Sequence, residues 1–232
     1  MQSHLYLIPS VLEESATETI APYIIDAVKN CQVIFAENER TARRFLKSVC
    51  KEIVIDDYEW FTIHKAEKEV LQSFRQKITA GKNIAIISEA GCPGIADPGQ
   101  ILIAAAQEMN ATVKPLVGPS SILLALMASG LNGQQFEFVG YLPIESLDRT
   151  QAIRALETAS QKNNSTKIFI ETPYRNNQMI ETLLKICKPA TRLCIAAELT
   201  SVNEYIKTKT IADWKKEKTD FHKKPVIFLL SV

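Results

Sequence analysis

Short apolar runs alternate with helix-like segments through the first half of the chain. The runs at Leu5–Ile8, Val33–Ala36 and Ile84–Ile87 each have the length and composition of a strand buried on both faces. Segments with helical spacing of apolar residues separate them, for example Lys65–Ala80. Strands that alternate with helices form parallel sheets, because each helix carries the chain back to the end of the sheet at which the previous strand began. The first half therefore predicts an α/β domain with a mainly parallel sheet and helices on both faces.

Local patterns give further detail in this half. The spacing of Ser15 and Glu18 is that of a capping box and predicts the start of the first helix. A basic helix is expected to run as far as Val49. Ile53–Ile55 is expected as a short third strand, and Thr112–Val117 as the last strand of this half.

The pattern changes after Val117. An apolar helix is expected to start at Gly118–Ser121 and to end at Gly130, and Pro143–Arg149 is expected as a loop before a helix over 150–161. Strands are expected near 135–141, 168–171, 193–198, 205–210 and 226–230. Little helix separates the last strands, which favours a second, mixed sheet. We therefore expect two α/β domains, residues 1–117 and 118–232.

Composition limits the class of protein. The 232 residues are 46% hydrophobic and 23% charged, with a formal net charge of +1, which is typical of a globular protein without an overall basic field. Five cysteines without C-x-x-C spacing and three scattered histidines favour free thiols and no metal site. No basic leader precedes the first strand, and no apolar run reaches membrane-spanning length. These features predict a cytoplasmic protein without membrane association.

The segment Ser88–Gly99 follows the apolar run Ile84–Ile87 and is rich in glycine and proline. Asp97 before Pro98 is the order expected at a helix start. Ligands bind at the carboxyl ends of strands in open α/β sheets, and glycines permit close backbone approach. An ordinary strand-to-helix connection is the alternative for this segment taken alone. The sequence contains no G-x-G-x-x-G or G-x-x-x-x-G-K-[ST] loop, so it lacks the motifs that usually indicate a cofactor bound through its phosphates.

In order along the chain, several segments resemble the tetrapyrrole methylase superfamily of S-adenosylmethionine-dependent methyltransferases. The resemblance is to its small-subunit ribosomal RNA methyltransferase I branch, which methylates a cytidine 2′-hydroxyl. That branch's S-D-A-G-T-P-x-I-S-D-P-G is similar to Ser88–Gly99, and its F-Y-E-S-P-H-R to Phe169–Arg175. Other similar segments are Ala36–Arg43, Leu116–Ser121, Ser129–Leu131, Gly140–Pro143 and Ala196–Glu204. The chain departs from the branch at Pro9–Glu13, which lacks a glycine, at Asn38, around His64, and after Val232, where the branch continues into a small helical domain.

The resemblance implies S-adenosylmethionine as methyl donor, bound in a cleft between the two domains, and a homodimer. It implies donor contacts from three parts of the chain. These are Ser88, Glu89, Ala90, Gly91, Pro93, Ile95 and Ala96; Ser120 and Ser121; and Thr172, Arg175 and Ala197. A free helix N-terminus at the two serines would suit a carboxylate, although plain helix capping is an equal alternative.

The residue that would take a proton from a hydroxyl acceptor is left open by the sequence. Candidates for catalysis are Glu37, Arg40, His64 and Arg175, with Glu171 as a further possible base. Glu37 and Arg40 would either pair with each other or face the acceptor. Arg43 and Arg44 extend a basic helix face that would meet phosphates or only solvent.

Three functions remain open at this stage. The first is methylation of a ribose 2′-hydroxyl in ribosomal RNA, with the RNA or the small-subunit particle as partner. The second is methylation of a small, tetrapyrrole-like acceptor. The third is binding of S-adenosylmethionine without catalysis.

Overall fold

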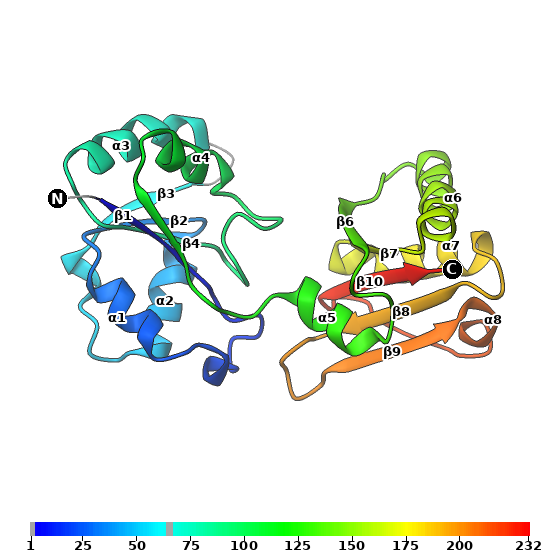
Figure 1. Cartoon of the computed structure of the whole chain (residues 1–232). Coiled ribbons are helices and arrows are strands. Elements are labelled where there is room, and N and C mark those ends of the chain that lie inside the picture. The colour runs from blue at the N-terminus through cyan, green and yellow to red at the C-terminus, as the bar shows by residue number, and fades with distance from the viewer. Residues whose placement is uncertain (1–2, 64–66) are drawn as a thin grey trace. The chain divides into compact units, whose positions relative to one another are not determined.

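The computed structural model describes residues 3–63 and 67–232 (Figure 1). The chain divides into two compact units, unit 1 (residues 1–120) and unit 2 (residues 121–232). Each unit has its own sheet of five strands.

Unit 1 contains a sheet in which all pairings are parallel. The strands lie in the order β3-β2-β4-β1-β5. Their bounds are β1 His4–Ile8, β2 Val33–Ala36, β3 Glu59–Thr62, β4 Ile84–Ile87 and β5 Thr112–Pro115. Every residue of β2 and β4 is buried, as an apolar strand covered on both faces requires. The parallel sheet predicted from the alternation is confirmed.

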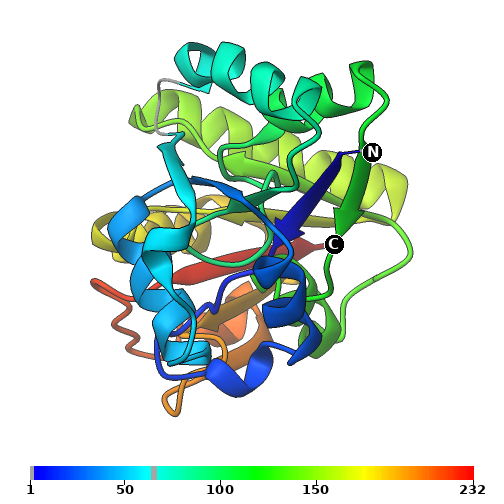
Figure 2. The ribbon, with the colours of Figure 1, turned by 90° about the vertical axis from the view of Figure 1, so that its left-hand side faces the viewer.

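Helices cover both faces of this sheet (Figures 1 and 2). One face packs against α1 (Tyr23–Lys29) and α2 (Glu39–Val49), and the other against α3 (Glu67–Thr79) and α4 (Gln100–Glu108). Strand residues alternate between the two cores. Ile34 contacts the side of α1 and α2, whereas Phe35 stacks edge-on against Phe74 of α3.

The sheet reverses its winding direction between β1 and β4. These neighbouring strands are followed by helices on opposite faces, α1 after β1 and α4 after β4. Such a switch point opens a crevice at the carboxyl ends of the two strands, and it is the usual ligand position in α/β sheets. The segment Ser88–Gly99 leaves β4 at this switch point.

Two of the elements expected in unit 1 are wrong. Ser15–Glu18 does not open the first helix, because 3-10 turn Thr17–Thr19 is followed by Pro22, and α1 starts only at Tyr23. Ile53–Ile55 is not a strand. A 3-10 turn at Ile55–Asp57 leads into β3, whose half-buried aromatic residues pair with β2 at the sheet edge.

Unit 2 contains the mixed sheet that the sequence predicts. Its order is β6-β7-β10-β8-β9; β6 and β7 are parallel and the other neighbours are antiparallel. The strand bounds are β6 Phe136–Tyr141, β7 Thr166–Ile170, β8 Arg192–Ala197, β9 Tyr205–Thr210 and β10 Val226–Ser231.

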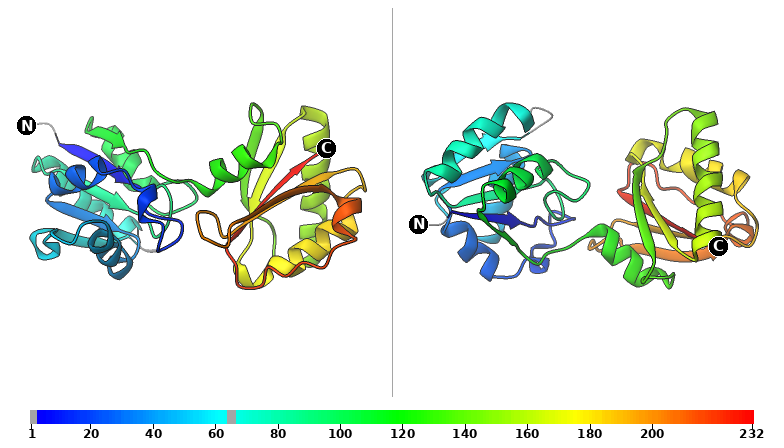
Figure 3. Two further views of the ribbon diagram at one scale, coloured as in Figure 1. Left: turned by 90° about the horizontal axis from the view of Figure 1, so that it is seen from below. Right: turned by 45° about the horizontal axis from the view of Figure 1, so that its top comes forward.

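One face of this sheet packs against α6 (Ser146–Asn163), α7 (Asn176–Ile186) and α8 (Ile211–Trp214), and α5 (Ser121–Ser129) contacts β9 and β10 (Figure 3). The 3-10 turn η3 (Pro173–Arg175) follows β7. The expected loop over 143–149 is partly wrong, because α6 begins at Ser146. Its polar first turn is anchored by the buried Arg149, which donates to the carbonyl of Ile144 over 2.7 Å.

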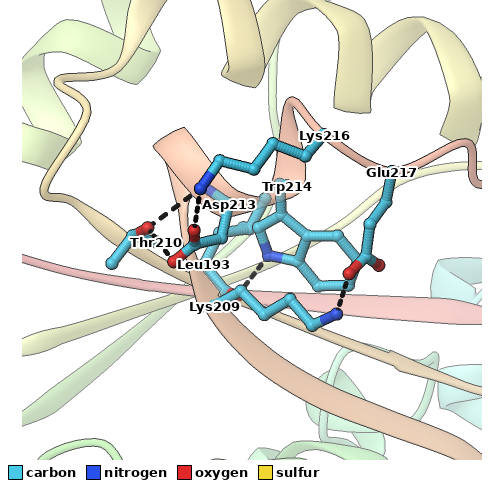
Figure 4. A network of polar contacts seen from close by, with 7 residues as sticks. All are labelled: Leu193, Lys209, Thr210, Asp213, Trp214, Lys216 and Glu217. Carbon is cyan, nitrogen blue, oxygen red and sulfur yellow. Dashed lines mark hydrogen bonds and ion pairs between the residues drawn. The ribbon is translucent and has the colours of Figure 1, made fainter.

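A polar network fixes the short helix α8 (Figure 4). Thr210 caps the helix by accepting from the Asp213 amide, and the buried indole of Trp214 donates to the Leu193 carbonyl over 2.8 Å. Lys216 pairs with Asp213, and Lys209 pairs with Glu217. These contacts join α8 to β9 and, through the Trp214–Leu193 bond, to β8, so the network has a structural role. Among the described residues, no helix is long and apolar enough to cross a membrane.

Candidate functional site

The segment Ser88–Gly99 is tied to the turn that follows β1. Ser10 and Gly91 exchange two backbone hydrogen bonds, of 2.8 and 3.1 Å, in an isolated antiparallel bridge. The buried Ser10 hydroxyl also donates to the Ser88 carbonyl over 2.8 Å. The loops after β1 and β4 are therefore joined directly above the switch point.

Four residues of this loop have left-handed backbone, namely Gly91, Gly94, Ala96 and Gly99, with φ from 64° to 118°. Ala96 is the exception to the glycine rule, since a Cβ disfavours this conformation by about 1 kcal/mol. Ile95 and Ala96 are exposed at the tip of the turn. The expected Asp97 cap is wrong, because Gly99 precedes the first helical residue, Gln100.

Three carboxylates surround the base of this loop. Glu37, which follows β2, accepts a hydrogen bond from the Glu89 amide over 2.9 Å, and Thr41 donates to the Glu89 carboxylate. Burial raises the pKa of Asp97 to about 6, and the charges of Glu37 and Glu89 contribute to this rise. A hydrogen bond from Ser88 lowers the pKa and offsets part of the rise. This part of the site therefore has a negative potential, which disfavours a phosphate and favours a cationic group.

The basic helix face is largely neutralised by local partners. Arg43 pairs with Glu39 at 2.7 Å and lies 5.0 Å from the ring centroid of Trp60. Arg44 pairs with Glu14, while Arg40 is exposed, and no ion pair joins it to Glu37 within the described residues. The structural pairing of Glu37 with Arg40 is thus not formed.

Asn38 explains one departure from the family pattern. Its side-chain oxygen accepts from the amides of Arg40 and Thr41, at 3.0 and 3.3 Å, and so caps α2. Asparagine and aspartate are equally good in this role. The substitution therefore keeps the start of the helix that follows Glu37.

The segment before α5 packs tightly against the same loops. A Cβ on Gly118 would lie 2.1 Å from the Cβ of Pro9, so only glycine fits there. The Cys92 thiol donates to the carbonyl of Pro119 over 3.5 Å. Of the two serines, Ser120 ends unit 1 and Ser121 is the first residue of α5.

The remaining expected donor residues lie in unit 2. Thr172 and Arg175 follow β7 and are partly buried, and Ala197 is buried at the end of β8. Glu171 is the centre of this group, with 1% of its side chain exposed. Its Oε1 accepts from the Thr172 amide at 2.6 Å and from Nε and Nη2 of Arg175 at 3.0 and 2.6 Å. Arg175 is consequently held by Glu171.

Sequence reasoning missed a second set of contacts beside this group. Asn176 is fully buried, and its side-chain amide donates to the carbonyls of Phe221 and Lys224 at 3.1 and 2.8 Å. Lys224 also pairs with Glu198. The two Asn176 bonds join residues 45 and 48 positions apart, and the Lys224–Glu198 pair joins residues 26 apart, so no local sequence pattern predicts them. His64 lies outside the described residues, and within the described part no cluster of three metal-ligating residues occurs.

Comparison with known proteins identifies the chain's relatives. The family model for tetrapyrrole (corrin/porphyrin) methylases matches residues 15–215. The chain is 31% identical to a ribosomal RNA small subunit methyltransferase I of Synechocystis sp., over 86% of this chain and 68% of that protein. It is 28% identical to the protein of the same name from Escherichia coli O157:H7, over 99% of this chain and 78% of that one.

Solved structures show the same fold. A diphthine synthase gives a TM-score of 0.70 at 12% identity, covering 99% of this chain and 90% of that one. The methyltransferase CobJ gives 0.62 at 14% identity, covering 99% and 93%. The family match spans most of both units. The chain thus belongs to the tetrapyrrole methylase family and is an S-adenosylmethionine-dependent methyltransferase.

Proposed function

We propose that this protein transfers a methyl group from S-adenosylmethionine to a ribose 2′-hydroxyl of small-subunit ribosomal RNA. The observation that supports this most strongly is identity of about 30% to proteins named ribosomal RNA small subunit methyltransferase I, extending over nearly the whole chain. The matched region, which covers 99% of the chain for the Escherichia coli protein, contains both the Ser88–Gly99 loop and the Glu171–Arg175 segment.

The residues present fit the proposed donor. S-adenosylmethionine has a cationic sulfonium and ammonium and no phosphate, and the carboxylates of Glu37, Glu89 and Asp97 complement such a charge. The left-handed turn around Ala96 exposes backbone groups that suit the adenosine and methionine ends. We propose that contacts come from Ser88, Glu89, Ala90, Gly91, Pro93, Ile95, Ala96, Ser120, Ser121, Thr172, Arg175 and Ala197.

The bound donor supplies a methyl group on a sulfonium sulfur, which leaves as a neutral thioether. The acceptor oxygen forms the new bond to the methyl carbon while the carbon–sulfur bond breaks, and the hydroxyl proton must leave the oxygen. Glu37 is the proposed base, because the Glu89 amide holds Oε2 while no hydrogen bond to Oε1 occurs among the residues that the structure describes, which leaves Oε1 to receive the proton. Alignment of the two substrates supplies much of the rate, about 7–11 kcal/mol in favourable cases.

Glu171 is less suited to the role of base. Its Oε1 already accepts three hydrogen bonds, two of them from the guanidinium of Arg175. These bonds occupy Oε1 and hold the carboxylate against Arg175 and the loop after β7. Glu171 and Arg175 are therefore proposed to position the loop after β7.

The test is transfer of tritiated methyl groups to small-subunit ribosomal RNA from cells that lack the corresponding methyltransferase. A 2′-O-methyl group blocks alkaline cleavage, so the label should be recovered in alkali-stable dinucleotides. Glu37→Gln should lower kcat by about 10²- to 10⁴-fold while binding of S-adenosylhomocysteine persists. Label in mononucleotides, or no label in RNA at all, would reject the proposal.

A small acceptor is the second candidate, because the negative potential around Glu37, Glu89 and Asp97 does not attract the phosphates of RNA. Turnover of a tetrapyrrole-like acceptor without RNA methylation would favour it. Binding of S-adenosylmethionine without turnover of either acceptor would favour a non-catalytic binding protein.

We further propose a cytoplasmic homodimer. The free state of all five cysteines suits a reducing compartment. Large apolar side chains are exposed in unit 2, among them Met127, Ile144 and Leu147, which suits burial against a second copy. Light scattering coupled to gel filtration tests the dimer, and a monomer mass at micromolar concentration would contradict it.

A further inference from the structure

An aromatic ring with an adjacent lysine and an adjacent histidine lies exposed on unit 2. Tyr174 lies on the turn after β7, and the residue is 70% exposed. The His222 ring meets it edge-on at 5.8 Å between centroids, and Nζ of Lys223 lies 5.9 Å from its centroid. We call these three residues the Tyr174 platform.

The platform is held in place by contacts between two distant segments. The Lys223 amide donates to the Pro173 carbonyl over 2.9 Å, and Lys223 has left-handed backbone with φ of 62°. Nearby, the Phe221 amide donates to Asn177 over 2.9 Å, and Asn177 in turn donates to Asp220. Glycine would adopt the Lys223 conformation without strain, so the structure maintains a lysine at an unfavourable position.

The segment leading to the platform is basic. Residues 215–224 contain five lysines and one histidine against two acidic residues, in a chain whose net charge is only +1. Asp220 is occupied by Asn177 and by the His222 amide. Within the described residues, no carboxylate lies within ion-pair distance of three exposed lysines, namely Lys215, Lys218 and Lys223.

We propose that the Tyr174 platform binds single-stranded RNA, with a base stacked on the Tyr174 ring and Lys223 against a flanking phosphate. An exposed aromatic ring beside a lysine that has no carboxylate partner is the combination that single-strand binding sites use. A purely acidic partner would use the lysines and leave the ring without a role. The inference rests on the proposed function, since it names a contact surface for the RNA acceptor.

Position supports this role. Tyr174 lies between Thr172 and Arg175, both proposed as donor contacts. RNA held at Tyr174 would therefore lie beside the part of the donor site that unit 2 contributes. The ring contacts that the structure describes are with His222 and Lys223, and neither of these residues is a proposed donor contact.

The test uses the full chain and a fluorescein-labelled single-stranded RNA of mixed sequence, about 12 nucleotides long, within the size range of single-strand sites. Fluorescence anisotropy measures Kd over a range of salt concentrations. Tyr174→Ala should weaken binding about 5- to 100-fold, and Tyr174→Phe, which keeps the ring, should change it less than about twofold. Lys223→Gln should reduce the slope of log affinity against log salt by about 0.7.

Tyr141→Ala is the matched control, because Tyr141 is another exposed tyrosine of unit 2 and lies on β6. It should bind the oligonucleotide like the native chain. Circular dichroism and S-adenosylhomocysteine binding verify that each variant is folded. Native affinity in Tyr174→Ala, an equal loss in Tyr141→Ala, or equally effective competition by polyglutamate would overturn the inference.

An assay of methyl transfer distinguishes failure of the Tyr174 platform from failure of the proposed function. If the native chain methylates ribosomal RNA while Tyr174→Ala keeps its oligonucleotide affinity and its KM, the platform is rejected and the proposed function stands. If the native chain neither binds the oligonucleotide nor methylates RNA, but methylates a small acceptor, both are rejected.

Discussion

Replacing Asp97 with asparagine should stabilise unit 1 at neutral pH and remove part of its pH dependence. Burial, together with the charges of Glu37 and Glu89, raises the pKa of Asp97 to about 6 in the folded chain. The ordinary aspartate pKa, about 3.9, applies to the unfolded chain. The amide oxygen of the introduced side chain would still accept from Ser88, so the substitution removes the charge and little else.

The sign follows from proton binding. Between about pH 4 and pH 6 the folded state keeps a proton on Asp97 that the unfolded state has lost, so the free energy of unfolding falls as pH rises through this window. Two pKa units correspond to about 3 kcal/mol. Solvent reaches this half-buried side chain, so we expect about 1.5 kcal/mol of destabilisation, complete above pH 6 and absent below pH 4.

Urea unfolding read by hydrogen exchange in peptides from β4 follows unit 1 alone. At pH 7.5 the midpoint of Asp97→Asn should lie about 0.5–1 M above that of the native chain, and the two should coincide at pH 4. Asp26→Asn, which removes an exposed carboxylate from α1, controls for the general loss of a negative charge. An unchanged or lower midpoint in Asp97→Asn at pH 7.5, or a shift that is the same at both pH values, would refute the reasoning.

Three further substitutions or modifications test other contacts. Gly118→Ala should cost about 2–3 kcal/mol in thermal unfolding, because its Cβ would overlap Pro9, and a loss below about 0.5 kcal/mol would show that the segment is loosely packed. Arg175→Met should destabilise unit 2 by about 2–3 kcal/mol, since it leaves the buried Glu171 without its cation, and a second change, Glu171→Gln, should restore much of the loss. Burial raises the pKa of Cys31 to about 12, so a maleimide should label Cys31 at pH 8 far more slowly in the native chain than in urea, as peptide mass spectrometry would measure.

The strands of the first sheet were largely predictable from sequence, whereas its edge was not. Val33–Ala36 and Ile84–Ile87 are found as predicted because burial on both faces requires continuous apolar runs. β3 is an edge strand with one neighbour, and its residues Glu59–Thr62, of which Glu59 is exposed and the others are half-buried, carry no such pattern. The start of α6 was missed for a related reason, since its anchor is a buried arginine, Arg149.

The site was predictable as a set of segments but not as a set of contacts. Glycine and proline spacing marks Ser88–Gly99 as a strand-end loop. The bond from the Glu89 amide to Glu37 and the approach of Lys223 to Tyr174 join residues about fifty positions apart. Such pairings depend on which loops the sheet order brings together. Strand order is a property of the whole fold, so local patterns do not contain it.

The central place of β4 has a consequence for protein synthesis. Among the described strands, β1 pairs with β4 and β5 and β2 pairs with β3 and β4, so β1 and β2 are joined in the sheet through β4. A growing chain on the ribosome must therefore extend past Ile87 before the sheet of unit 1 can close. The Ser10–Gly91 bridge forms later still. Until then, the apolar edges of β1 and β2 are open to chaperones and to other nascent chains.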